Sequence, residues 1–150
     1  MNQDFLDILH ALSDAEVRFL VVGAYAVGVH GHPRATGDLD LWVEASPENA
    51  SRIWKALRAF GAPLHQVSES EFATSGIVFQ IGVVPRRIDI LTEITGVDFA
   101  TAWSHRTVAM FGDLACPVLG REELLVNKRS TGRDKDLVDA RALERLPPRT

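Results

Sequence analysis

The chain has 150 residues, of which 46% are hydrophobic and 24% charged, and its 16 basic and 20 acidic side chains leave a net charge of −4. This length and composition predict one domain over residues 1–150 with a sizeable core, and they exclude disorder, collagen and coiled coil. The mild acidity argues against a broad DNA-binding surface. It still allows a nucleotide or RNA substrate held by a local basic patch.

The longest nearly unbroken apolar stretch covers residues 19–29 and is shorter than the roughly 18 residues that a membrane-spanning helix needs. The first four residues are polar and acidic, whereas a secretory signal begins with basic and then apolar residues. We therefore expect a cytoplasmic protein with no membrane segment. Cys116 is the only cysteine, which excludes an internal disulfide, and its neighbours predict a buried strand end.

The N-terminal segment predicts a helix, a strand and a second helix in close succession. Apolar residues at spacings of three and four predict an amphipathic helix over residues 2–15, and a short buried strand follows at 18–22. Gly23 comes directly after this strand. The small residues that follow it fit a tight turn into a short helix, which ends before Gly31.

A polar loop at 32–37 leads into a second predicted strand at 38–43. The next helix has a clear beginning and end: Ser46 is a good N-cap, Pro47 suits the first helical position, and Gly61 closes the apolar stripe.

The second half of the chain predicts mainly short elements. They are an exposed loop at 62–75, strands at 77–83 and 87–92 around a turn at 84–86, a short helix at 98–103, a hairpin of strands 107–111 and 114–118, and helices at 121–128 and 134–146. This order predicts the α/β (α+β) class: a single mixed sheet covered by helices.

The most informative residues are Asp38 and Asp40, which form a D-x-D pattern on the second strand. Their side chains point to the same face of the sheet, about 6.6 Å apart along the strand, and such a pair can bind Mg²⁺. An isolated D-x-D is more often ordinary solvated surface. Here Leu39 and Leu41 alternate with the aspartates, which indicates a central strand. Two like charges close together on such a strand repel each other, which favours a functional role for them.

A third carboxylate, Asp89, lies between apolar residues on a later strand. If that strand pairs beside the D-x-D strand, three carboxylates converge on one face. Their repulsion would be costly without a divalent cation, and two Mg²⁺ ions about 3.5–4 Å apart would relieve it. The alternative for Asp89 is a salt bridge to Arg86 or Arg87.

Gly23 and Ala24 lie where a strand meets a helix N-terminus. Free amide groups and the helix dipole favour an anion there, and a residue without bulk lets a phosphate approach the backbone. A glycine in such a turn is also explained by sterics alone.

His30 and His32 are spaced like metal ligands, but His30 lies at a predicted helix C-terminus, where a cation is favoured, and we prefer that interpretation. The tryptophans are interpreted as core or interface residues.

Taken together, these residues resemble the DNA polymerase β-like nucleotidyltransferase superfamily. Its signature is a Gly-Gly or Gly-Ser turn, then D-x-D, then a distant third carboxylate. Residues 34–40 (RATGDLD) and 128–139 (KRSTGRDKDLVD) are similar to the small bacterial branch that includes the toxins of abortive-infection systems. The resemblance covers most of the chain, from residue 18 to residue 143, and it implies the polymerase β palm-like fold.

The resemblance implies that Asp38, Asp40 and Asp89 hold the metals and that Asp89 takes the proton of the attacking group. Gly23 would meet the triphosphate of the NTP. The chain departs from the pattern at Ala24, which offers only its backbone amide where a serine or a second glycine is usual.

Two further positions match C-terminal residues of the nucleotide site in the toxin branch, namely Lys128 and Asp136. Their alternative roles are an exposed cation at a helix end and a first-turn acid favoured by the helix dipole. Arg34 and Thr36 border the D-x-D and are candidates to steer a phosphate or a polyanionic acceptor.

The sequence therefore predicts an enzyme that transfers a nucleoside monophosphate from an NTP to tRNA, a protein hydroxyl or a small molecule with two Mg²⁺ ions. A toxin role with an antitoxin partner is an extension of this hypothesis. The competing interpretation is an inactive domain of the same fold that binds a nucleotide or a partner protein.

Overall fold

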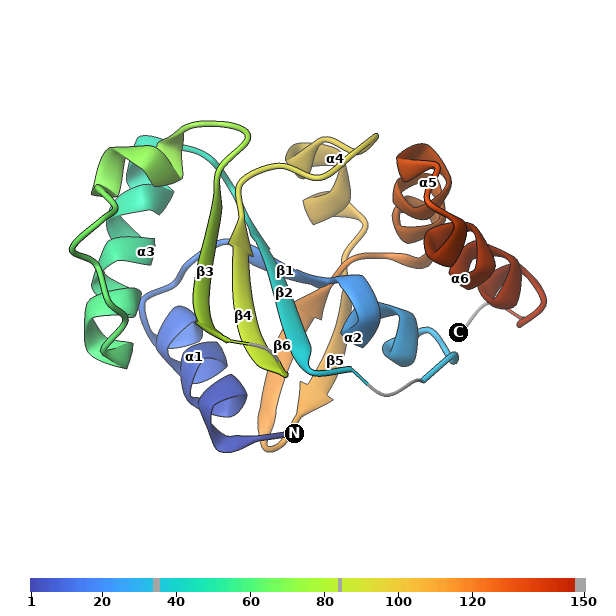
Figure 1. Cartoon of the computed structure of the whole chain (residues 1–150), viewed down its shortest axis with the longest axis horizontal. Coiled ribbons are helices and arrows are strands. Elements are labelled where there is room, and N and C mark those ends of the chain that lie inside the picture. The colour runs from blue at the N-terminus through green and yellow to red at the C-terminus, as the bar shows by residue number, and fades with distance from the viewer. Residues whose placement is uncertain (34–35, 84, 148–150) are drawn as a thin grey trace.

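The computed structural model describes residues 1–33, 36–83 and 85–147 (Figure 1). Its helices within these ranges are α1 (Gln3–Asp14), α2 (Gly23–Val29), α3 (Pro47–Phe60), the short 3₁₀ helix η1 (Glu69–Ala73), α4 (Phe99–Ser104), α5 (Arg121–Thr131) and α6 (Asp134–Glu144). Its strands are β1 (Phe19–Val22), β2 (Asp38–Val43), β3 (Val78–Val83), β4 (Arg86–Leu91), β5 (Thr107–Phe111) and β6 (Leu114–Val118).

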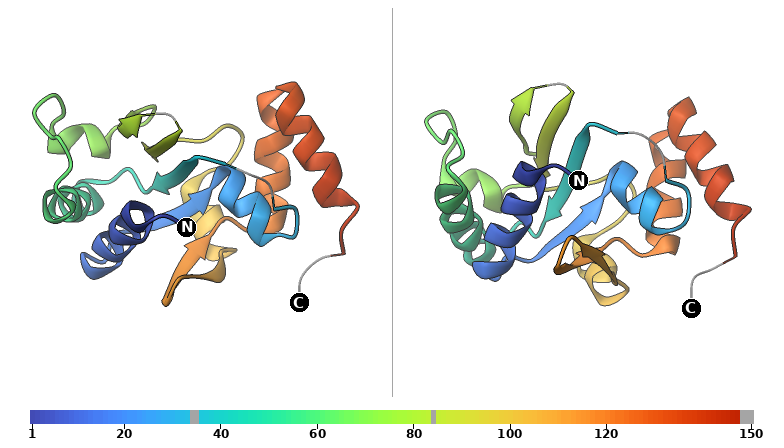
Figure 2. Two further views of the ribbon diagram at one scale, coloured as in Figure 1. Left: turned by 60° about the horizontal axis from the view of Figure 1, so that its bottom comes forward. Right: turned by 90° about the horizontal axis from the view of Figure 1, so that it is seen from below.

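Within the described residues, six strands form one mixed sheet in the order β3-β4-β2-β1-β6-β5. β2 runs parallel to β4 and β1 runs parallel to β6, whereas the other neighbours are antiparallel. Helices α1 and α3 lie on one side of the central strands, and α2, α5 and α6 gather on the other side (Figures 1 and 2). The predicted class, a single mixed sheet covered by helices, is confirmed.

The first and third helices form as their sequences predict. Asn2 caps α1 by accepting a hydrogen bond from the amide of Phe5, and the apolar stripe of that helix is buried. Ser46 caps α3 in the same way, and Gly61 ends it in the left-handed region at φ +89°. In the part of the chain that the structure describes, no helix combines the length and apolarity needed to cross a bilayer.

The Ser- and Glu-rich part of residues 62–75, which was expected to be an exposed loop, is exposed at 68–70 but is not simply a loop. Residues Glu69–Ala73 form η1, and Phe72 within it is fully buried. The ring of Phe72 lies 5.8 Å from that of Phe79 and 6.5 Å from that of Trp54. A single aromatic residue among polar neighbours produces no periodic pattern, so the burial of Phe72 could not be predicted from local sequence. Other element boundaries differ by three residues or fewer at each end.

A buried side chain that the sequence analysis did not single out, Asn49, joins the two central strands at one end. Its Oδ1 accepts a hydrogen bond from the amide of Arg18 at 2.8 Å, and its Nδ2 donates to the carbonyl oxygens of Arg18 and Glu44 at 3.1 and 2.8 Å. Asn49 is fully buried, and its side chain adds to the backbone bonds here, in which the amides of Glu44 and Ser46 donate to the carbonyl oxygens of Arg18 and Glu44 at 3.1 and 3.2 Å. It therefore helps to hold β1 beside β2, the strand that carries the D-x-D.

We expect Asn49→Ala to lower the free energy of unfolding by about 1–3 kcal/mol, because it removes the three hydrogen bonds of a fully buried side chain and takes the Asn49 acceptor away from the amide of Arg18. Urea denaturation followed by circular dichroism measures the change. Asn127→Ala is the matched control, since Asn127 makes one exposed hydrogen bond to the carbonyl of Thr95, and it should cost less than about 0.5 kcal/mol. Equal losses in the two variants would contradict the proposed link between β1 and β2.

Candidate active site

Three carboxylates converge on one face of the sheet where β2 and β4 run side by side. The parallel register sets Asp40 directly opposite Asp89 and Asp38 opposite Arg87. Neighbouring parallel strands in register point paired residues to the same face, so Asp38, Asp40 and Asp89 share it. This convergence was predicted on the condition that the two strands are neighbours, and the condition is met.

Arg87 lies among these carboxylates and is bonded to two of them. Its Nε donates to Oδ1 of Asp89 at 2.8 Å, and its Nη2 donates to Oδ2 of Asp89 at 3.2 Å and to Oδ2 of Asp38 at 3.5 Å. The salt bridge considered as the alternative role of Asp89 is therefore present, and its partner is Arg87. One guanidinium offsets part of the repulsion among three acids.

Asp40 has the most perturbed carboxylate of the cluster. Its burial, and then the negative charges of Asp89 and Asp38, raise its pKa to about 6, while Lys128 acts in the opposite direction. At pH 6 about half of the Asp40 side chains therefore carry a proton. The positive charges of Arg87 and Lys128 do not fully balance the three carboxylates. A perturbed carboxylate in a cleft is a common sign of a functional site.

Gly23 forms the rim of the cleft at the start of α2. It has φ +68°, and a Cβ atom on it would collide with Oδ2 of Asp40. Glycine is therefore required both for the backbone conformation and for the close approach of the carboxylate. Val22 at the N-cap provides no side-chain hydrogen bond, and Ala24 lines the cleft beside Gly23. The backbone amides of this turn are thus placed beside the carboxylates.

Lys128 and Asp136 form a buried ion pair. The alternative role of Lys128 as an exposed cation is therefore wrong, whereas Asp136 does lie in the first turn of α6, as its alternative role required. Nζ of Lys128 lies 3.0 Å from Oδ1 of Asp136 and 3.3 Å from Oδ2 of Asp139, and all three residues are buried. Thr131 and Arg133 each donate to Oδ2 of Asp136 at 2.7 Å. Burial acts to raise the pKa of Asp136, but these hydrogen bonds and Lys128 hold it below its ordinary value.

These groups surround a cleft with a volume of about 370 Å³. Its lining includes Gly23, Ala24, Thr36, Asp38, Asp40, Arg87, Asp89, Lys128, Arg133, Lys135 and Asp136. Among the candidates from the sequence, the cleft brings together all except Arg34, which lies outside the described residues. Thr36 has its side chain turned to the strand: its Oγ1 accepts from the amide of Asp38 at 3.2 Å.

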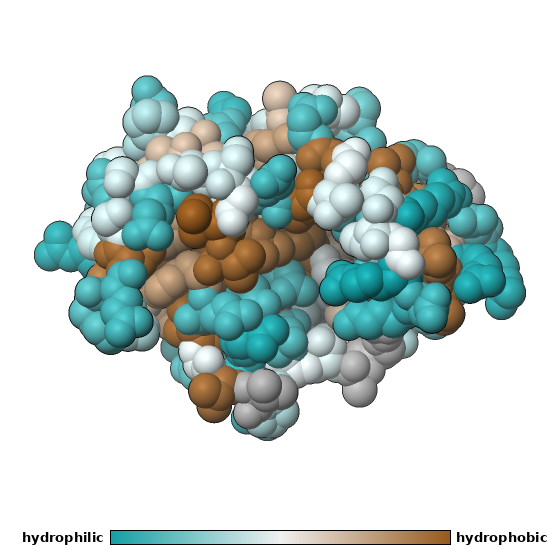
Figure 3. Space-filling model, turned by 45° about the horizontal axis from the view of Figure 1, so that its top comes forward, coloured by the Kyte–Doolittle hydropathy of each residue, from teal (hydrophilic) through white to brown (hydrophobic). Residues whose placement is uncertain are grey.

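Thr131, Arg133 and Asp139 were not predicted individually as site residues. All three belong to the segment 128–139 that carried the resemblance, where Thr131 ends α5, Arg133 is the N-cap of α6 and Asp139 lies on α6. Figure 3 shows apolar side chains gathered over the middle of one face, with polar residues on both sides of them.

The donor set suits a hard divalent cation. Oδ1 of Asp38 is buried and finds no hydrogen-bond partner among the described residues, and Asp40 is crowded by two other carboxylates. Oxygen ligands of this type are those that Mg²⁺ prefers. In the conformation described, no three His, Cys, Asp or Glu side chains among the described residues are grouped closely enough to share an ion. Arg87 bridges Asp38 and Asp89 instead, so a cation would have to compete with its guanidinium.

The histidines do not form part of this site. His30 is the C-cap of α2, as expected, but it is buried, and its Nε2 lies 2.8 Å from the carbonyl oxygen of Leu119. His32 is not among the residues that line the cleft. Trp42 is buried and its ring lies 5.0 Å from that of Phe99, so the expectation of a core residue is confirmed.

Comparison with solved structures identifies the fold. The lincosamide antibiotic adenylyltransferase LnuA, in its lincomycin-bound form, aligns with a TM-score of 0.61 and 14% identity over 98% of each chain. The antibiotic-resistance factor ANT(2'')-Ia aligns with a TM-score of 0.63 and 13% identity over 93% of this chain and 80% of that one. A putative nucleotidyltransferase from Thermotoga maritima, TM1012, aligns with a TM-score of 0.55 and 16% identity over 96% and 92%.

Neither protein-family models nor curated proteins match the sequence. At 13–16% identity, the structural likeness shows a nucleotidyltransferase-type fold and no more. The function must therefore be argued from the residues in the cleft.

The raised pKa of Asp40 predicts how the free energy of unfolding depends on pH when no metal is present. The folded pKa of about 6 is above the ordinary value of 3.8, so the folded state retains the proton longer and loses stability as pH rises from 4 through 6. In EDTA, Asp40→Asn should therefore gain about 1–3 kcal/mol relative to the parent between pH 4 and pH 7.5. Urea denaturation across this range measures the difference, and parallel curves for the two proteins would contradict it.

Proposed function

We propose that this protein is a nucleotidyltransferase that transfers a nucleoside monophosphate from an NTP to an acceptor hydroxyl and releases pyrophosphate. The observation that carries the proposal is the placement of Asp38, Asp40 and Asp89 on one face of adjacent parallel strands, with Gly23 at the rim. Paired carboxylates beside a glycine turn match the needs of phosphoryl-type transfer, which are positioning and neutralisation of charge.

In this proposal, Asp38, Asp40 and Asp89 hold two Mg²⁺ ions. Bound there, the ions would neutralise phosphate charge and hold the reacting oxygens for an in-line displacement. Two observations support this assignment: Oδ1 of Asp38 is buried with no hydrogen-bond partner in the described part of the chain, and the pKa of Asp40 is raised. Both carboxylates would gain from a bound cation. Metal binding would then also favour the ionised form of Asp40.

The other residues of the cleft have roles that follow from their charge and place. The backbone amides of Gly23 and Ala24 would bind phosphate oxygens. Lys128, held by Asp136 and Asp139, offers a fixed positive charge toward Asp40 and the cleft. Asp89 is the candidate to accept the proton of the attacking hydroxyl, and Arg87 would keep its carboxylate oriented.

The acceptor is an RNA, a protein hydroxyl or a small molecule, and the cleft alone does not choose among them. A small-molecule acceptor gains support from LnuA, which is an adenylyltransferase of lincosamide antibiotics. A toxin role with an antitoxin partner rests only on the resemblance of residues 34–40 and 128–139. Incubation with each α-labelled NTP and a cell extract, followed by separation of the labelled products, identifies the acceptor.

An inactive domain of the same fold is the second candidate. The observations in its favour are the pairing of Asp89 with Arg87 and the lack of a hydroxyl at Ala24. Such a domain would bind an NTP and release no pyrophosphate. Metal-dependent release of pyrophosphate therefore separates the two candidates.

Asp89→Asn tests the catalytic assignment, because it keeps the size of the side chain and removes its charge. We expect pyrophosphate release to fall by about 10²-fold or more, while the fold is preserved in EDTA. Asp7→Asn is the matched control: Asp7 is exposed on α1, and its variant should keep the parental rate. The proposal fails if Asp89→Asn folds and releases pyrophosphate at the parental rate.

Ala24→Ser tests the phosphate turn. Because Ala24 contributes only its backbone amide, NTP binding should depend strongly on Mg²⁺ and weakly on this side chain, and the serine variant should bind NTP as well as the parent or modestly better. Isothermal titration calorimetry with and without EDTA measures both effects. Equally tight binding in EDTA would be inconsistent with a site that contains three carboxylates.

A further inference from the structure

Strand β5 forms one edge of the sheet, on the far side of β6 from the central strands. We infer that β5 pairs antiparallel with β5 of a second copy of this chain, so that the two sheets become continuous. This inference does not rest on the proposed function, because β5 contributes no residue to the cleft that holds the three carboxylates.

The backbone of β5 directs hydrogen-bonding groups away from β6. Residues of an antiparallel pair alternate between bonded and non-bonded positions. Pro117 has no N–H group and lies opposite Val108, and a two-residue turn closes the hairpin at the bonded pair Phe111 and Leu114. Both facts assign Val108 and Met110 to the non-bonded positions, so their N–H and C=O groups point to the open edge.

The side chains of β5 are unusual for an exposed edge. Val108 and Met110 are each 63% exposed and share one face of the strand, and no residue from Thr107 to Phe111 is charged. Edge strands that stay unpaired are commonly protected by charged residues, proline or bulges, and β5 has none of these.

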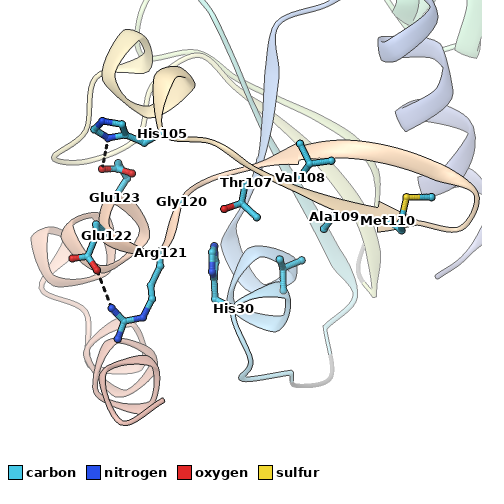
Figure 4. Close-up of a pocket in the computed structure, with 11 residues that line it drawn as sticks. His30, His105, Thr107, Val108, Ala109, Met110, Gly120, Arg121, Glu122 and Glu123 are labelled. Atoms are coloured by element: carbon cyan, nitrogen blue, oxygen red, sulfur yellow. Dashed lines mark hydrogen bonds and ion pairs between the residues drawn. The ribbon is translucent and has the colours of Figure 1, made fainter. Parts of the chain in front are cut away.

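The space beside β5 is open along the strand. A groove of about 970 Å³ is lined by Thr107, Val108, Ala109 and Met110 on one wall. In Figure 4, the charged residues at the other end of the groove pair with one another, His105 with Glu123 and Arg121 with Glu122. The wall formed by β5 is therefore the part that offers unpaired backbone and apolar side chains.

The sequence of β5 is complementary to itself in one register. An antiparallel pair centred on Ala109 places Val108 of each copy opposite Met110 of the other. These are the positions whose backbone groups face outward, so the two strands would form four hydrogen bonds. The exposed Val108 and Met110 side chains of both copies would then form one apolar cluster.

Charge complementarity at the ends favours a second copy over an unrelated strand. In this register, His105 of one copy lies opposite Asp113 of the other, and Arg106 lies opposite Gly112 in the same turn. Asp113 is largely exposed and lies 3.2 Å from His10, and His105 is more than half exposed and lies 3.1 Å from Glu123, so a partner would reach both beside these exposed contacts within the chain. The basic end of each strand thus meets the acidic turn of its partner at both ends of the interface.

Sedimentation velocity on the full chain tests the inference. The parent should sediment with twice the 16.5 kDa mass of one chain, and Val108→Lys should sediment as a single chain, because a charge on the paired face opposes association. Val78→Lys is the matched control, since Val78 is 56% exposed on β3, the opposite edge strand, and should remain a dimer.

Disulfide trapping tests the register and does not depend on the stability of Val108→Lys. A non-bonded antiparallel pair has its Cα atoms about 4.5 Å apart, within the range of a disulfide, so Ala109→Cys should give a covalent dimer on mild oxidation. Cys116 is buried and its pKa is raised to about 11 by burial, so it should not react.

The inference is overturned if the parent protein stays a single chain at every concentration. It is also overturned if the parent does not self-associate but binds a different protein through β5. A parental dimer that dissociates on Val78→Lys but not on Val108→Lys also overturns it, because the interface would then lie on β3. Failure of Ala109→Cys to cross-link in a parental dimer contradicts the proposed pairing.

Discussion

Repulsion among three carboxylates is the constraint on which the rest of the structure depends. The parallel pairing of β2 with β4 sets Asp40 beside Asp89 on a face where burial limits solvation. Arg87 and Lys128 bring positive charge to the cluster from two directions, one from β4 itself and one from α5. These two cations do not balance all the negative charge of the carboxylates. Near pH 6 a proton on Asp40 neutralises part of the remainder, and in the proposed site a divalent cation would do so at higher pH.

The C-terminal helices are connected to this constraint through a second ionic cluster. Lys128 on α5 is fixed by Asp136 and Asp139 on α6, and Thr131 and Arg133 complete the hydrogen bonds of Asp136. Removing one member of such a buried cluster leaves an unpaired charge and costs several kcal/mol. The packing of α5 on α6 and the charge that reaches the cleft are therefore set by the same residues.

Much of this could be predicted from local sequence. The caps Ser46 and Gly61, the alternation around Asp38 and Asp40, and the hairpin turn each have a physical cause within a few residues. The sequence did not reveal the burial of Phe72, the three hydrogen bonds of Asn49 or the burial of Lys128, because these depend on contacts between distant segments. For the same reason Arg87 was only an alternative partner for Asp89, since strand register decides which cation reaches the cluster.

The close approach of Gly23 to Asp40 has a consequence for how this chain can change over time. Even alanine at position 23 would force the carboxylate away and strain the turn, so two parts of the cleft would be lost in one step. A side chain at position 23 is thus compatible with this backbone only if the Asp40 carboxylate moves as well, so positions 23 and 40 are constrained as a pair.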